Sequence, residues 1–351
     1  MDKILIVKTS ALGDVIHAYP VVTYLRKKFP HAKIDWVVEA QCQNLVQAHP
    51  EVNKAIPIAT KAWRRSPFSQ ETIQEIKAFS RHLREEKYDV VFDLQGNIKS
   101  GIITAAARSR YKVGFGIQSV PEKPNVLFTN KRFNPPPNGN IRQDYLAVVS
   151  SFFGEELPLL ECEPVQLRIS EKQLRDLQAI LHKPQLHNGP YVMVCAGSAW
   201  PNKQLTVEAL GDFLDLLRRD IKCSFLFSWG SLDEMLIAGI LHGRFARNSF
   251  LMDKLNLAAL QNLMGMCQLV VAVDSLPLHL AGTTNVPTFS VFGASSAHKY
   301  NPPGHKHIAF QGQCPYGRTF TKRCPILRTC PTGACIRSLT GDVLFTHYRA
   351  L

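Results

Sequence analysis

Short apolar runs rich in β-branched and aromatic residues alternate with amphipathic stretches along the whole chain. The runs lie at 3–8, 33–39, 89–94 and 112–116 in the first half and at 190–196, 222–229, 268–274 and 287–293 in the second. They are almost continuously apolar, which is typical of strands covered on both faces. The stretches 14–28 and 70–86 have the spacing of helices. This alternation predicts an α/β protein with parallel sheets and crossover helices.

The chain has 351 residues, more than one ordinary domain, and we expect two doubly wound domains in series. The proline cluster 135–137 is interpreted as a loop inside the first domain, because the sequence after it favours a helix. A polar region places the hinge near 165–188. The predicted domains are therefore 1–170 and 185–338, followed by a C-terminal segment, 339–351, that could pack back on the first domain. Ligands are expected at the carboxyl ends of the strands and in the cleft between the domains.

The chain is strongly basic. It has 41 Lys and Arg against 28 Asp and Glu, a net charge of +13, and residues 1–150 contribute 22 basic and 13 acidic residues to these totals. Such a field attracts anionic partners, namely nucleic acids, phosphorylated molecules or acidic membrane headgroups. A generally soluble basic surface is the alternative. No helix-turn-helix, RNP or zinc-finger signature is present, so nucleic acid is not an expected partner.

The cysteines bear on the compartment and on metal binding. No apolar run is long enough to cross a bilayer and no export signal is recognisable, so we expect a cytoplasmic protein with reduced thiols. Cys314, Cys324, Cys330 and Cys335 lie close together near the C-terminus. They suggest a structural zinc or iron site, although their spacing lacks a C-x-x-C pair. Reduced structural thiols or an adventitious disulfide remain open.

The turn TSALGD follows the first predicted strand and precedes a helix. It lacks the G-x-G-x-x-G pattern of dinucleotide-binding turns, which argues against a nicotinamide or flavin cofactor here. The small residues Ser10 and Gly13 allow another molecule to approach the backbone closely. Asp14 has two interpretations, a helix cap or a carboxylate directed at a substrate, and the local sequence does not decide between them.

Two further strand-to-helix turns carry polar residues. Gly197 and Ser198 begin a plausible anion-binding turn in which Lys203 could place an ammonium group near a phosphate. The alternative is an ordinary surface lysine, since no Walker A spacing is present. Asp274, Ser275 and His279 follow another buried strand, where they could bind a diphosphate or sugar hydroxyls. His279 taken alone would more often be structural.

Five segments in this order resemble the bacterial lipopolysaccharide heptosyltransferases of glycosyltransferase family nine. They are VKTSALGDVIHAYP, DLQGNIKS, AGSAWPNKQ, SWGSLDE and DSLPLHLAG, which begin at residues 7, 93, 196, 228 and 274. The similarity spans nearly the whole chain, and the N-terminal block is most similar to the heptosyltransferase I branch. The resemblance implies a GT-B fold, two Rossmann-like domains facing a central cleft. It also implies transfer of L-glycero-D-manno-heptose from ADP-heptose, with inversion, to the Kdo–lipid A inner core.

The resemblance also implies roles for individual residues. Asp14 matches the family's catalytic aspartate, Lys203 its phosphate-binding lysine and Glu234 the glutamate that binds the nucleotide ribose. The remaining donor-binding candidates are Ser10, Gly13, Gly197, Ser198, Leu255, Asp274, Ser275 and His279. Leu276 departs from the pattern because it replaces a glycine, and leucine cannot adopt positive φ cheaply.

The acceptor side would use the basic first half of the chain. Lys61, Arg64 and Arg65 match the family's basic segment that faces the phosphorylated acceptor, and Lys99, Lys123 and Arg142 are further candidates. Trp63 and Phe68 are expected either to pack beneath this surface or to belong to the core. The acceptor would bring the protein to the inner face of the inner membrane.

Elementary chemistry agrees with these roles. Displacement at an anomeric carbon needs a base for the acceptor hydroxyl and stabilisation of the departing diphosphate, but no covalent nucleophile. Inverting glycosidases also need an acid because their leaving group is poor. One carboxylate therefore suffices here, and no cofactor is required. The alternatives are a second-heptose transferase, a GT-B enzyme for another nucleotide sugar, or a non-catalytic anion-binding module.

Overall fold

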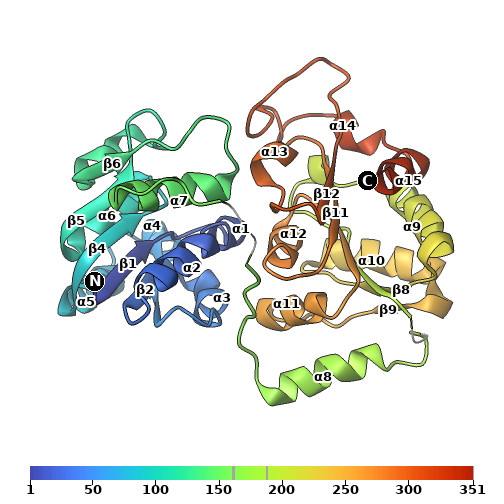
Figure 1. The fold of residues 1–351 in the computed structure, drawn as a ribbon, viewed down its shortest axis with the longest axis horizontal. Helices are drawn as coiled ribbons and strands as arrows, with labels where there is room; N and C mark the ends of the chain where they lie inside the picture. Colours follow the sequence, from blue (N-terminus) through green and yellow to red (C-terminus); the bar gives the residue numbers. More distant parts are fainter. Residues whose placement is uncertain (160–162, 187–188, 351) are drawn as a thin grey trace. The chain divides into compact units, whose positions relative to one another are not determined.

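The computed structural model describes residues 1–159, 163–186 and 189–350. The chain divides into two compact units, residues 1–160 and 161–351, and each unit is described by itself. Each unit is built on one six-stranded, fully parallel sheet (Figure 1). The predicted fold class of doubly wound α/β units is confirmed.

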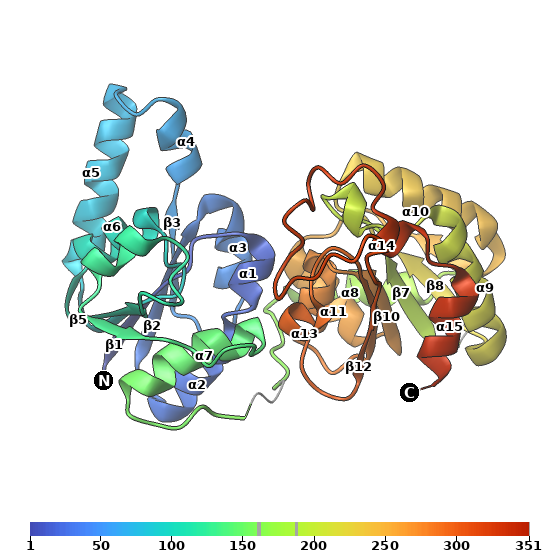
Figure 2. The same cartoon turned by 90° about the horizontal axis from the view of Figure 1, so that it is seen from above.

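The first unit alternates strands and helices. Its elements are β1 (Lys3–Val7), α1 (Leu12–Ile16), α2 (Tyr19–Lys28), β2 (Lys33–Glu39), η1 (Ala40–Cys42), α3 (Gln43–Gln47), β3 (Lys54–Ile58), α4 (Thr60–Arg65), α5 (Gln70–Glu85), β4 (Lys87–Asp93), α6 (Ile98–Ala106), β5 (Arg108–Phe115), η2 (Lys123–Phe128), β6 (Lys131–Phe133) and α7 (Ile141–Phe152). Helices α5 and α6 cover one face of the sheet, and α2 and α7 pack together on the other (Figure 2).

The strand order of the first sheet is β3-β2-β1-β4-β5-β6. The chain winds outward from β1 through β2 to β3, then returns to the other side of β1 to begin β4. The reversal point lies at the carboxyl ends of β1 and β4, and doubly wound sheets bind ligands at such points. The turn that carries Asp14 follows β1 directly.

The second unit repeats this plan. Its elements are α8 (Glu171–Leu181), β7 (Tyr191–Cys195), η3 (Pro201–Lys203), α9 (Val207–Ile221), β8 (Ser224–Phe227), α10 (Leu232–Arg244), η4 (Ala246–Asn248), β9 (Ser249–Leu251), α11 (Leu257–Gly265), β10 (Leu269–Val273), α12 (Leu276–Ala281), β11 (Thr288–Phe292), α13 (Ala297–Tyr300), β12 (His307–Gln311), α14 (Ala334–Arg337) and α15 (Gly341–Arg349). The order β12-β11-β10-β7-β8-β9 places the reversal between β7 and β10. Helices α9, α10 and α15 cover one face, and α8, α11 and α12 the other (Figure 2).

One region differs from the predicted domain plan. The region 170–185, expected to be a linker, contains α8, whose Leu177 is buried and which packs against α11. In the C-terminal segment, α15 lies against α9 and buries Leu344 in the core of the second unit. The predicted hinge also includes residues 187–188, which lie outside the described residues.

The helix predicted at 14–28 is two helices. Helix α1 ends at Ile16, and α2 begins at Tyr19 with Pro20 as its second residue. Proline has no N–H to donate and fits the first turn of a helix, so it favours a new helix start over continuation. The break separates Asp14 from the longer helix that follows.

All four strands missing from the sequence-based prediction are sheet edges. They are β3, β6, β9 and β12, and two of them have only three residues. An edge strand pairs on one side only and is less enclosed, so it needs no continuous apolar run; β3 even contains Pro57.

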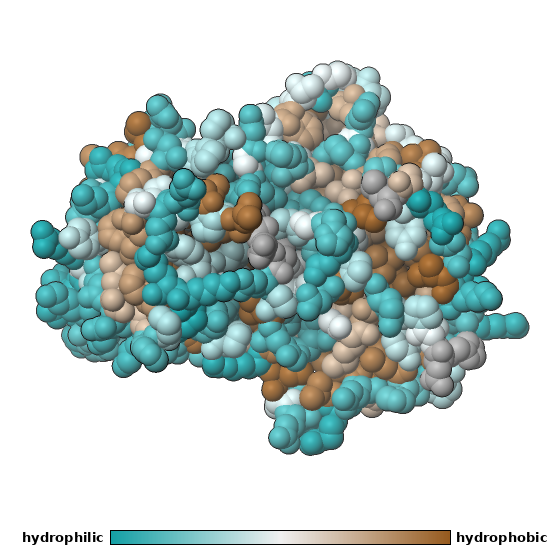
Figure 3. All heavy atoms as spheres, viewed as in Figure 1, coloured by the Kyte–Doolittle hydropathy of each residue, from teal (hydrophilic) through white to brown (hydrophobic). Residues whose placement is uncertain are grey.

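Polar residues dominate the surface seen in Figure 3, and the hydrophobic side chains lie between them as separate patches. Within the part of the chain that the structure describes, no helix is both long and apolar enough to cross a membrane.

Candidate functional site

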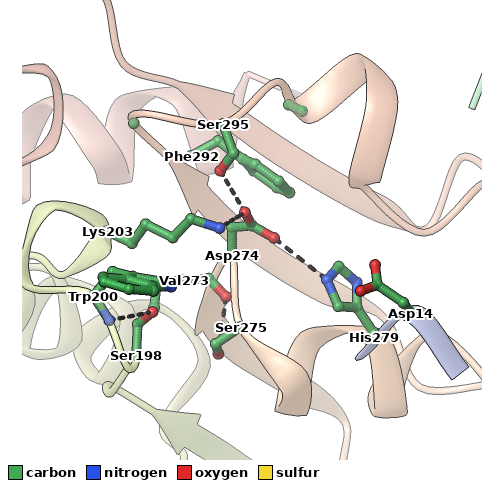
Figure 4. A network of polar contacts seen from close by, with 12 residues as sticks. Asp14, Ser198, Trp200, Lys203, Val273, Asp274, Ser275, His279, Phe292 and Ser295 are labelled. Atoms are coloured by element: carbon green, nitrogen blue, oxygen red, sulfur yellow. Dashed lines mark hydrogen bonds and ion pairs between the residues drawn. The ribbon is translucent and has the colours of Figure 1, made fainter. Parts of the chain in front are cut away.

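A buried ion pair occupies the reversal point of the second sheet. Lys203 ends η3 in the connection after β7, and Asp274 follows β10 directly. The Lys203 Nζ donates a hydrogen bond to Asp274 Oδ2 (Figure 4). The two residues are only 7% and 5% exposed. Adjacent parallel strands thus bring together two residues that are 71 positions apart in sequence.

Two more side chains converge on the same carboxylate (Figure 4). His279 Nε2 lies 3.3 Å from Asp274 Oδ1, and the Ser295 hydroxyl donates to Oδ2. Burial alone would raise the pKa of Asp274, but the hydrogen bond from His279 and the charge of Lys203 outweigh it and hold this pKa well below its usual range. An ionised Asp274 therefore anchors an ammonium and an imidazole at the carboxyl edge of the sheet.

The turn after β7 is shaped by a close approach between Gly197 and Glu234. A Cβ at position 197 would lie 2.1 Å from Glu234 Cγ, so a larger residue there would force the Glu234 side chain to move. The Glu234 carboxylate also accepts the N–H of Gly230 at 2.7 Å. Ser198 is buried, and its carbonyl accepts from Gln204 at 2.5 Å. These contacts hold Glu234 beside the turn that leads to Lys203.

The remaining predicted donor residues lie on neighbouring turns. Ser275 is the N-cap of α12, and its hydroxyl donates to the Val273 carbonyl at 3.3 Å. Leu276 is the first residue of α12 and does not have positive φ, so the absence of the family glycine costs no backbone strain. Leu255 is half-buried just before α11, one residue ahead of the cap Asn256.

In the first unit, Asp14 is the third residue of α1. Its Oδ2 accepts the N–H of Ala11 at 3.2 Å, and His17 Nδ1 lies 3.7 Å from Oδ1. The Asp14 side chain is nevertheless 31% exposed, so one side of the carboxylate faces solvent. It supports the helix start and keeps an open face, and the two interpretations offered by the sequence are compatible.

Gln95 holds the turn between β1 and α1, a role that sequence reasoning missed. Its Oε1 accepts the backbone N–H groups of Thr9 and Ser10 at 3.2 and 3.1 Å, so the residues just before Gly13 are fixed from the neighbouring strand end. The segment DLQGN was recognisable, and the reversal between β1 and β4 would have placed Gln95 opposite Ser10.

The buried Asp93 fixes the turn that carries Gln95. Its carboxylate accepts the N–H groups of Gln95 and Gly96 at 3.0 and 2.9 Å, the Ser100 hydroxyl at 2.9 Å and the Asn125 amide at 2.7 Å. Burial raises the pKa of Asp93, while these hydrogen bonds act in the opposite direction.

The basic acceptor candidates fall into two groups. Lys61, Arg64, Arg65 and Lys123 are exposed, and the two arginines end α4. Two candidates are not free surface charges. Lys99 is paired with the buried Glu39 at 3.0 Å, and Arg142 is only 3% exposed on α7.

The two aromatic residues near the α4 arginines, Trp63 and Phe68, have different environments. Trp63 packs against Phe79 with ring centroids 5.9 Å apart. Phe68 neither packs beneath the basic surface nor belongs to the core, because it is 92% exposed in the turn between α4 and α5.

The four C-terminal cysteines line a single pocket in the second unit. Burial, together with the nearby thiols, raises the pKa of Cys335 to about 11, whereas the N–H groups of Gly333 and Thr332 lower the pKa of the partly exposed Cys330. Among residues 1–159, 163–186 and 189–350, however, no three His, Cys, Asp or Glu side chains are placed to hold a metal ion. The thiols as they lie do not form a ligand set.

Each unit thus places polar groups at its own reversal point. The second unit offers an ammonium, an imidazole and small residues, which suits a diphosphate. The first unit offers one partly exposed carboxylate, which suits a general base.

Comparison with known proteins agrees with this chemistry. The family model described as glycosyltransferase family 9 (heptosyltransferase) matches residues 76–329. Lipopolysaccharide heptosyltransferase 1 of Pseudomonas aeruginosa is 28% identical over 323 residues, 92% of this chain and 87% of the relative. The enzyme of the same name from Escherichia coli K12 is 28% identical over 83% of this chain and 88% of its own length.

A solved structure gives the same result. Escherichia coli heptosyltransferase WaaC with ADP-2-deoxy-2-fluoro heptose is 26% identical, with a TM-score of 0.73 over 89% of this chain and 93% of that one. The resemblance found in the sequence motifs is therefore confirmed, and so is the GT-B type of fold. This chain belongs to glycosyltransferase family 9, the heptosyltransferases.

Proposed function

We propose that this glycosyltransferase moves L-glycero-D-manno-heptose from ADP-heptose, with inversion, to the Kdo–lipid A inner core of lipopolysaccharide. The observation that carries the proposal is the buried Lys203–Asp274–His279 group at the reversal point of the second sheet. The relatives named as heptosyltransferase 1, and the WaaC structure with a fluorinated ADP-heptose, support the donor and the position of transfer.

In this proposal the second unit binds the donor. The Lys203 ammonium and His279 contact the diphosphate, and Asp274 holds both groups in place. Glu234 binds the ribose hydroxyls, and Leu255 lies beside the adenine. Gly197, Ser198 and Ser275 form the edges of the donor site, and Ser10 and Gly13 allow the heptose to approach the first turn.

Asp14 acts as the base. It accepts the proton of the acceptor hydroxyl while that oxygen bonds to the anomeric carbon from the face opposite the diphosphate. The bond from the anomeric carbon to the diphosphate oxygen breaks, and ADP leaves with the electron pair. Lys203 stabilises the negative charge that develops on ADP. Heptosyltransferases act without a cofactor, and no step in this scheme requires one.

The first unit would bind the acceptor. Lys61, Arg64, Arg65 and Lys123 are exposed cations suited to the phosphates of lipid A. Because this acceptor is a lipid, the enzyme would work as a peripheral protein at the inner face of the inner membrane.

A transfer assay tests the function. Purified protein with ADP-heptose should release ADP and heptosylate Kdo-lipid A, with an inverted anomeric configuration by NMR and no competition from polynucleotides. It should not act on an acceptor that already carries the first heptose. Product only on the heptosylated acceptor would identify a second-heptose transferase. ADP-heptose binding without either product would contradict the proposed acceptor.

Asp14→Asn tests the base. The variant should lower kcat by about 10²-fold or more, as expected for removal of a general base. Donor affinity and the melting temperature should change little. Glu71→Gln is the matched control, since Glu71 is an acidic residue in the first turn of α5 and has the same favourable relation to the helix dipole. A lower melting temperature with unchanged kcat would contradict the assignment of Asp14 as the base and leave it only the role of a helix cap.

Replacing Arg64 and Arg65 by alanine tests the acceptor surface. The double variant should raise KM for Kdo-lipid A several-fold and leave KM for ADP-heptose unchanged. It should also bind anionic vesicles more weakly, in a salt-dependent way. Replacing Lys77 and Arg81 of α5 by alanine removes the same two positive charges from another exposed helix and is the control. An unchanged acceptor KM and unchanged vesicle binding would exclude this surface.

We also propose that the four C-terminal thiols bind a structural zinc or iron ion. Support comes from their shared pocket, although the side chains would have to turn toward a common centre. Elemental analysis of protein purified without chelator should find about one metal ion per chain, as for a tetrathiolate site. Cys324→Ser should lose it, whereas the buried Cys223→Ser should retain it. Metal-free protein with four reduced thiols would refute the site.

A further inference from the structure

The cysteine-rich segment, defined as residues 313–335, packs against two turns of the donor site in the second unit. One turn is η3, which carries Lys203, and the other is 293–296, which carries Ser295. Lys203 and Ser295 are the two groups that donate to Asp274 Oδ2. The segment therefore contacts both of the elements that donate to Oδ2 of this carboxylate.

The first contact runs through Asn202, the neighbour of Lys203. Its side-chain amide donates to the carbonyls of Leu327 and Cys330 at 2.9 and 2.8 Å. Its carbonyl side faces Gly333, where an added Cβ would lie 2.5 Å from Asn202 Oδ1. One side chain thus ties the cysteine-rich segment to η3 by two hydrogen bonds and close packing.

The second contact is a short backbone pairing. Ser295 and Arg323 form an isolated antiparallel bridge, the Cys324 N–H donates to the Ala294 carbonyl at 2.8 Å, and the Ser296 N–H donates to the Lys322 carbonyl at 2.9 Å. Ser295 is fully buried, and this backbone pairing fixes the position of its hydroxyl group.

Side chains reinforce both contacts. Arg328 stacks on Trp200, with 4.6 Å between the guanidinium carbon and the ring centroid, just before η3. Gly293 lies so close to Cys335 that a Cβ there would be 3.2 Å from its Sγ. Asn202 and Ala294 both line the pocket that the four cysteines surround. The pocket therefore lies between the two donor-site turns.

We propose that the cysteine-rich segment positions Lys203 and Ser295 around Asp274, with Asn202 as the positioning residue that transmits this order to the donor diphosphate. This inference rests on the proposed donor role of Lys203. Asn202 itself is turned to the carbonyls of the segment, so it acts through its neighbour. A change in the segment that shifts residues 327–330 moves η3 and hence the ammonium group.

Donor binding to Asn202→Ala tests the proposal. Loss of two hydrogen bonds should raise the dissociation constant for ADP, and KM for ADP-heptose, by about tenfold. KM for the acceptor should not change. Lys203→Ala shows how much ADP affinity is lost when the ammonium group is removed altogether. Thr319→Ala is the matched control, because Thr319 is an exposed residue of the same segment. A purely structural role would lower the melting temperature and leave ADP affinity unchanged at temperatures well below it.

Gly333→Ala disturbs the contact between Asn202 and the cysteine-rich segment from the side of the segment. Its Cβ would displace the Asn202 side chain, so ADP affinity should fall in this variant as well. The fall should be smaller when Asn202 is already alanine, because the clash is then absent and only the backbone strain of alanine at φ +58° remains. Equal effects of Gly333→Ala in the two backgrounds would overturn the assignment of Asn202.

A measurement on the wild-type protein tests the proposal without any variant that could fail to fold. If donor binding and order in the segment are coupled, saturating ADP must also stabilise the segment, because linkage is reciprocal. Iodoacetamide alkylation of the partly exposed Cys330 should then slow several-fold in ADP. Wild-type transfer and ADP binding, combined with an unchanged alkylation rate and unaffected variants, would reject this inference while leaving the proposed function intact. Failure of the wild type to bind ADP would reject both.

Discussion

The buried carboxylate of Asp274 is the interaction on which the second unit depends. Four segments meet there, from the ends of β7, β10 and β11 and from the first turn of α12. A carboxylate this deeply buried is stable only with compensating partners, and removing one partner from such a group costs several kcal/mol. The partners of Asp274 are also the groups suited to a diphosphate. The same contacts that make its burial tolerable therefore fix the positions of Lys203 and His279 at this edge of the sheet.

The two units have the same sheet topology but carry different polar groups at the reversal point. Each has a chain reversal that brings two strand ends together, and each uses a buried aspartate nearby. In the second unit Asp274 pairs with the Lys203 ammonium and the His279 imidazole, which leaves the edge suited to anions. In the first unit Asp93 accepts only neutral donors and, through Gln95, fixes the backbone around Ser10. The Lys203 ammonium group and the backbone around Ser10 are thus fixed by different contacts at equivalent places in two similar sheets.

The sequence predicted the interior strands and the strand-end turns well, since both depend on local patterns. Continuous apolar runs marked the buried strands, and small or polar residues marked the turns that carry Asp14, Lys203 and Asp274. The edges β3, β6, β9 and β12 escaped because single-sided pairing imposes no such run. Helix α8 was taken for linker, although its Leu177 shows the burial of a packed helix.

Long-range partners could not be derived from local patterns. Ser295, Gln95 and Asn202 form ordinary polar side-chain contacts whose partners lie 21 to 128 residues away. The basic residues were easy to find but hard to sort, because charge alone does not distinguish the exposed Arg64 from the buried Arg142. Only the packing of α7 makes that distinction.

The contact between Gly197 and Glu234 has a consequence for how this site can diverge. Any side chain at 197 would occupy the space now filled by the stem of Glu234. A larger residue at 197 is tolerable only if 234 becomes smaller, and the Gly230 N–H would then lose its acceptor. The effects of substitutions at 197 and 234 should therefore depend on each other, and a double change should differ from the sum of the two single changes.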